Sequence, residues 1–173
     1  MLVCILFDSL MVSSLFFNVY TNYNELLVKI LNKIDYMFLI AWATSLFLYN
    51  FVITHRQNNK PSKKIYNVFV VTIILDLICF VVLSLLDVNI VLIDVVNQTA
   101  QGPSVTFSIV VCLFYLLAAL VMTLINYKKI GKKNIPVFIA ILMAIVIAIL
   151  FSINPYLIII SMGLTMLNLI MFF

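Results

Sequence analysis

Long apolar runs separated by short polar tracts form the main pattern of this chain. The runs lie at about residues 1–20, 37–54, 65–86, 105–127, 136–153 and 156–173. Each is close to the roughly 20 mostly apolar residues that an α-helix needs to cross a bilayer. The pattern therefore predicts an all-α, polytopic membrane helical bundle of about six transmembrane helices, with residues 1–173 as a single integral membrane domain.

The basic residues predict the orientation of this bundle. Residues 55–64 contain four lysines and arginines, residues 128–134 contain four lysines, and neither segment has an acid. Loops rich in lysine and arginine stay on the cytoplasmic side of a membrane. We therefore expect a multi-pass protein of the cell membrane, with both basic loops in the cytoplasm. Residues 87–104, which hold acids and no base, are expected outside.

The remaining polar segments permit more than one local structure. Residues 21–36 have a helical apolar stripe, which fits either a short amphipathic helix at the interface or an extension of the next span. Asn89–Val96 is mostly β-branched and apolar, which predicts a short β-hairpin in the outer loop. Asn97-Gln98-Thr99 matches a glycosylation acceptor. His55 is expected to be a solvated loop histidine.

Composition supports the membrane assignment. The chain is 66% hydrophobic and 9% charged, with mean hydropathy +1.27, whereas a soluble domain has about 25% charged residues. The net charge of +4 falls mainly in the two basic loops, where it suits anionic lipid and not nucleic acid. The lipid bilayer is therefore the first expected partner.

The motifs of common enzyme classes are missing from the sequence. It has no phosphate-binding glycine loop, no zinc-ligand spacing and no Ser-His-Asp set, and it contains one histidine. We therefore expect no catalytic residue, no metal site and no cofactor. The three cysteines, Cys4, Cys79 and Cys112, are scattered through apolar runs and are expected to be small buried residues.

Two acids within predicted spans, Asp76 and Asp8, are the candidate intramembrane polar site. A charge at mid-membrane is costly, by roughly 2.5 kcal/mol or more, so such residues suggest function. No span has a basic residue near its centre to pair with Asp76. We therefore expect Asp76 to be neutral and to donate a hydrogen bond that locks helices together, with a ligand or proton site as the alternative. Asp8 lies nearer a membrane face and is expected to reach water.

Small residues form a stripe on the fifth predicted span. Ala140, Ala144 and Ala148 recur every four residues and so share one helix face. Small faces let helices approach closely in lipid, so this stripe predicts a helix-packing surface.

Several short motifs of this chain are similar to those of a known family. They are Gly102-Pro103-Ser104-Val105-Thr106-Phe107, Tyr127-Lys128-Lys129, Asn134-Ile135-Pro136-Val137-Phe138 and the segment from Ile153 to Ser161, with a weaker match at Phe7–Val12 and Asn24–Trp42. In these stretches the chain resembles the N-terminal membrane region of bacterial sensor histidine kinases. Similar regions also precede diguanylate cyclase domains.

This resemblance implies a sensory, signal-transducing membrane module of a two-component receptor. In that family a further helix usually precedes the first span, and a phosphoacceptor helix pair and an ATP-binding domain follow the last. His55 does not match the phosphoacceptor, so we expect a non-enzymatic sensor module without its output domain. The family also implies a homodimer formed through the cytoplasmic region. A small transporter or channel-like protein using Asp76 is the alternative, and neither interpretation identifies a ligand.

Overall fold

The computed structural model describes residues 25–55, 63–92 and 98–126, together with residues 138–139, 141–143, 145–146 and 149. The predicted spans at residues 1–20 and 156–173 lie outside this part of the chain, as does most of the span at 136–153.

Three long helices form the described structure: α2 (Glu25–His55), α3 (Lys63–Leu85) and α4 (Pro103–Ile125). A helix of 23 residues, the length of α3 and of α4, is about 35 Å long, which exceeds the hydrocarbon thickness of a bilayer. All three are long and apolar enough to cross a membrane. The prediction of a helical protein is therefore confirmed for these three segments, and each of them is a candidate membrane span.

α2 combines a charged first part with an apolar second part. Glu25 begins the helix and its carboxylate pairs with Lys29 one turn later, at 2.6 Å. An acid at the N-terminus suits the helix dipole, and this spacing places the pair on one face. The helix then continues without a break to His55. The amphipathic segment is thus an extension of the span, one of the two alternatives that the sequence left open.

The helix boundaries differ by a few residues from the predicted spans. α3 begins at Lys63, so two lysines assigned to the basic loop belong to its first turn. α4 begins at Pro103 and ends at Ile125, two residues before each predicted bound. Proline suits the first helical turn because its missing N–H would be unpaired there. Hydropathy alone places the start of α4 later, because it does not take into account the residues that favour a helix start.

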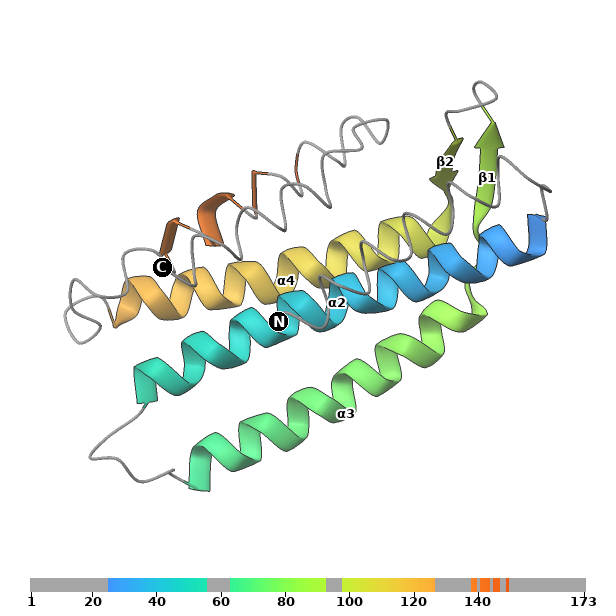
Figure 1. Ribbon diagram of the computed structural model, residues 1–173. Coiled ribbons are helices and arrows are strands. Elements are labelled where there is room, and N and C mark those ends of the chain that lie inside the picture. The colour runs from blue at the N-terminus through green and yellow to red at the C-terminus, as the bar shows by residue number, and fades with distance from the viewer. Residues whose placement is uncertain are drawn as a thin grey trace.

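Two short strands lie at one end of the helices. β1 (Asn89–Leu92) and β2 (Gln98–Gln101) pair antiparallel, with Asn89 opposite Gln101 and Leu92 opposite Gln98. Figure 1 shows this pair beyond the end of α3 and the start of α4. The connecting residues 93–97 lie outside the described structure, so the type of turn and the environment of the glycosylation motif remain sequence-based predictions.

A tight junction joins the end of α3 to the start of α4. The Ser104 hydroxyl donates to the carbonyl oxygens of Leu86 and Asp87, at 2.9 and 3.0 Å. Gly102, just before α4, has φ +127°, and a Cβ there would lie 3.1 Å from the Asp87 oxygen. Such a φ favours glycine. The junction therefore holds the two helix ends together through backbone groups.

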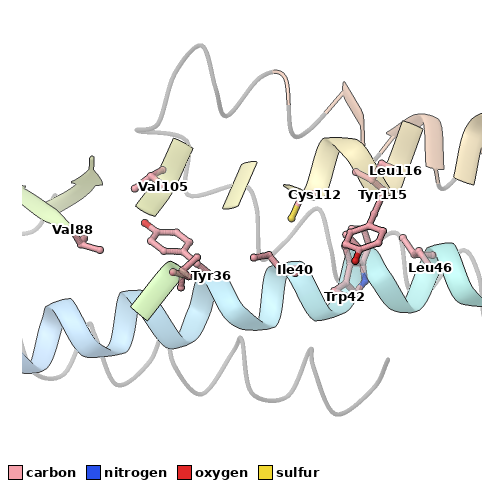
Figure 2. Packing of buried hydrophobic residues seen from close by; sticks show 11 residues of the cluster. Tyr36, Ile40, Trp42, Leu46, Val88, Val105, Cys112, Tyr115 and Leu116 are labelled. Carbon is pink, nitrogen blue, oxygen red and sulfur yellow. The ribbon is translucent and has the colours of Figure 1, made fainter. Parts of the chain in front are cut away.

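α2 occupies the middle of the three helices and packs most extensively on α4 (Figure 1). Figure 2 shows the buried cluster between them, with Ile40, Trp42 and Leu46 on α2 facing Cys112, Tyr115 and Leu116 on α4. α3 contributes little to this cluster. Most of its length exposes large hydrophobic side chains: Tyr66, Phe69, Val71, Ile73, Ile74, Leu75, Leu77, Ile78, Val81 and Leu85. A surface of this kind suits lipid or another helix.

His55 differs from its prediction as a solvated loop residue. It forms the last turn of α2, where its ring stacks on Phe51 with centroids 4.2 Å apart. Its Nδ1 lies 3.2 Å from the Phe51 carbonyl oxygen. The helix continues farther than the apolar run indicates, because a histidine in the last turn can satisfy one of the free carbonyl groups there.

Candidate functional site

Asp76 lies near the middle of α3 and binds the other two helices. Its Oδ1 accepts one hydrogen bond from the Thr44 hydroxyl on α2 and one from the Tyr115 hydroxyl on α4, each at 3.0 Å. We call this arrangement of Asp76, Thr44 and Tyr115 the Asp76 contact. A single oxygen atom is therefore shared by side chains from all three helices.

The two hydroxyl donors are held in place by the packing of α2 on α4. Thr44 and Tyr115 are both buried, and the Tyr115 ring packs against Phe47 of α2 with centroids 5.7 Å apart. Figure 2 shows this ring reaching from α4 toward Trp42. The donors are thus fixed by the α2–α4 pair, and α3 supplies the acceptor.

The hydrogen-bond partners of Asp76 in the described structure are hydroxyl groups. The ion pair within the described segments joins Glu25 to Lys29, near the start of α2, and involves no residue of the Asp76 contact. Polar groups at membrane depth need internal partners, and interhelical hydrogen bonds supply them. The sequence-based expectation that Asp76 donates is not what the structure shows at Oδ1. Because both neighbours present hydroxyl hydrogens, this oxygen is an acceptor.

Two cysteines lie one helical turn from the contact. Cys79 follows Asp76 by three residues on α3, and Cys112 precedes Tyr115 by three residues on α4. Both are free thiols; Cys112 is buried and Cys79 half-buried. Within the described ranges, no three acids, histidines or cysteines group closely enough to hold a metal ion. The chemistry that these residues offer is hydrogen bonding and the gain or loss of a proton.

A second polar contact joins α2 to α4 nearer to the C-terminal end of α2. Asn50 is 2% exposed, and its amide donates to the Ala119 carbonyl at 2.7 Å and to the Thr123 hydroxyl at 2.6 Å. The Thr123 hydroxyl in turn donates to the same carbonyl at 2.8 Å. We call this set of residues the Asn50 contact. It fastens α2 to α4 without any ionisable group.

A lysine provides a further link between α2 and α3. The Lys33 ammonium group donates to the Ser84 carbonyl oxygen at 2.7 Å, in the last turn of α3. Carbonyl groups at a helix C-terminus carry partial negative charge and are satisfied well by a cation. This link lies at the end of α3 that joins the strands.

The structure brings together only some of the residues proposed from the sequence. Asp76 lies at a three-helix contact, whereas Asp8 and the stripe of Ala140, Ala144 and Ala148 lie outside the residues whose surroundings are described. Thr44, Tyr115 and Asn50 were not selected from the sequence. Asn50 carried a usable signal, an amide inside an apolar run. The hydroxyl residues did not, because threonine and tyrosine occur throughout the chain.

Comparison with known proteins adds no name to this geometry: no protein-family model, no curated protein and no solved structure matches the chain.

Proposed function

We propose that this chain is a membrane-embedded sensory module of a two-component receptor. In this proposal six helices cross the cell membrane, with residues 55–64 and 128–134 in the cytoplasm and residues 87–104 outside as a β-hairpin loop. The charge asymmetry of these loops supports the orientation. The resemblance of the motifs around Gly102 and Asn154 to sensor kinase membrane regions supports the function.

The observation that carries the proposal is the unequal attachment of the three described helices. α2 and α4 share most of the buried cluster and the Asn50 contact. α3 is mostly exposed, and among the described residues its side-chain hydrogen bonds to the other helices are those of Asp76, supplemented by Lys33 of α2 at its end. A helix attached at few points can shift against a firmly packed pair. Such a shift of one helix is a common signalling transition.

The proposed mechanism links the outer loop to the cytoplasmic side through α3. A stimulus acting on the loop or within the bundle favours one of two positions of α3 relative to the α2–α4 pair. Because α3 ends in the Ser104–Asp87 junction, movement of the loop is transmitted directly to this helix. The module acts on a kinase domain as a homodimer and performs no chemistry of its own.

A chimeric receptor tests this proposal. Residues 1–173 are joined to the cytoplasmic kinase part of a bacterial sensor, and transcription of a phosphorylation-dependent reporter is measured. We expect Asp76→Leu to change the basal reporter output severalfold, because it removes the acceptor of both hydroxyl groups. The matched control is Leu77→Ala, at an exposed position on the same helix. Equal output from the two variants and the unaltered chimera, at equal membrane abundance, contradicts a sensory role of this contact.

The alternative function is a small transporter or channel-like protein in which Asp76 binds the transported ion. The observation that favours it is the carboxyl group with two hydroxyl neighbours at mid-helix. Ion flux into liposomes containing the full chain separates the two functions. Flux that is abolished by Asp76→Asn supports transport, whereas no flux above empty liposomes supports the sensory module.

A further inference from the structure

The Asn50 contact and the Asp76 contact differ in whether a proton can change them. Asn50 holds α2 to α4 through a neutral amide, which keeps the same donors at every physiological pH. Asp76 holds α3 through a carboxyl group, whose charge and donor pattern depend on protonation. The Asn50 contact is therefore independent of pH, whereas the Asp76 contact can respond to a proton.

The geometry at Oδ1 places an acceptor between two hydroxyl donors, and an ionised carboxyl is the stronger acceptor. Two hydroxyl groups point their hydrogens at the same oxygen atom. Hydrogen bonds to an ionised group are roughly twice as strong as those between neutral groups. Protonation removes this charge and adds an O–H donor beside two hydroxyls that already donate. Both bonds therefore weaken together when the carboxyl takes up a proton.

The packing determines which helix responds. α3 places few side chains in the core; Leu83 is its fully buried apolar residue within the described structure. α2 and α4 remain joined by the buried cluster around Ile40 and Leu116. Weakening of the Asp76 contact thus loosens α3 and leaves the α2–α4 pair intact.

We propose that protonation of Asp76 releases α3 from the α2–α4 pair, so that the proton regulates the sensory module. The inference rests on the proposed function only in naming α3 as the signalling helix. Within the described segments, Asp76 faces Thr44 from α2, Tyr115 and Cys112 from α4, and Cys79 on its own helix. None of these groups is basic, so the contact contains no cation to replace the proton.

Distances between spin labels on the full chain in liposomes test the proposal. Tyr66→Cys on α3 and Ile125→Cys on α4 are both highly exposed and lie toward the same end of their antiparallel helices. The native cysteines are replaced by alanine. The control pair combines Val52→Cys on α2 with Ile125→Cys. Both pairs are measured at about pH 8, which is well above the ordinary titration range of a carboxyl group, and at about pH 5, which is closer to that range.

We expect acidification to add a longer α3–α4 distance, shifted by about 2 Å or more as in known helix transitions, while the α2–α4 distance stays constant. In Asp76→Asn the side chain no longer titrates, so the α3–α4 distance should be the same at both pH values. In the Thr44→Val, Tyr115→Phe double variant, the longer distance should be present at both.

Two results overturn the proton proposal: an α3–α4 distance in the unaltered site that ignores pH, or the same pH-dependent change in Asp76→Asn. The measurement is independent of the kinase chimera. A pH-dependent distance with a silent chimera would retain the proton response and reject the sensory role. A fixed distance together with a chimera that responds to Asp76→Leu would reject the proton response and retain the sensory role.

Discussion

The Tyr115 hydroxyl on α4 donates to Oδ1 of Asp76 on α3 at 3.0 Å, the same oxygen atom that Thr44 reaches from α2. This pair links two helices that otherwise contact each other little, since α4 packs mainly on α2. The hydrogen bond therefore helps to hold α3 in position, and its loss should change the position of α3 before that of the other two helices.

The Asn50 contact should stabilise the α2–α4 pair measurably. Asn50→Leu keeps the branching of the side chain but removes the donors to Ala119 and Thr123. We expect a loss of about 1 kcal/mol in the free energy of unfolding, the usual size of an interhelical hydrogen bond in a membrane. Thermal unfolding in detergent measures it. Tyr49→Phe, at the neighbouring exposed position, should leave the melting temperature unchanged, and equal melting of both variants would remove the contact from the account.

The junction before α4 should not tolerate a side chain at Gly102. Gly102→Ala places a Cβ 3.1 Å from the Asp87 oxygen in a backbone conformation with φ +127° and ψ −177°. A conformation of this kind costs other residues about 1–3 kcal/mol. We expect a lower melting temperature in detergent for this variant. Gln101→Ala, at the adjacent exposed strand residue, serves as the control, and a Gly102→Ala variant as stable as this control would contradict the strained turn.

How much of this site the sequence predicts depends on the type of residue. Asp76 was identified because a carboxyl group in an apolar run is rare and therefore informative. Thr44 and Tyr115 were not, because which hydroxyls meet an acid depends on the rotation of each helix about its axis. Hydropathy contains no information on that rotation when a helix is apolar on all sides, as α3 nearly is. The structure shows how α2 and α4 are rotated relative to each other, because the Tyr115 ring packs against Phe47.

Helix boundaries were predicted less well where charge and apolar pattern disagree. Hydropathy does not show that the charged first part of α2 belongs to one continuous helix. Glu25, Lys29 and Lys33 form local or interhelical contacts there that a hydropathy scale does not represent. The proposed packing stripe of Ala140, Ala144 and Ala148 remains a prediction. Ile141, next to its first member, is fully buried in a cluster with Ala119.

The proposed topology predicts which loops can be labelled from outside the cell. In a variant without the native cysteines, a cysteine at Gln98 should react with a membrane-impermeant thiol reagent added to intact cells. Cysteines at Gln57 and Gly131 should react only after the cells are permeabilised, since lysine-rich loops stay inside. Labelling at Gly131 in intact cells would reverse the orientation of the whole bundle.

The central claim is that hydroxyl groups of α2 and α4 hold α3 through Asp76, and a double-mutant cycle on Asp76 and Tyr115 tests it most directly. The free energy of unfolding in detergent is measured for the unaltered chain, Asp76→Ala, Tyr115→Phe and the double variant. We predict that the two substitutions are not additive, with a coupling of about 1 kcal/mol between them. Leu117→Ala, on the same helix and 49% exposed, should show no coupling to Asp76→Ala. Strict additivity of Asp76→Ala and Tyr115→Phe would contradict the claim.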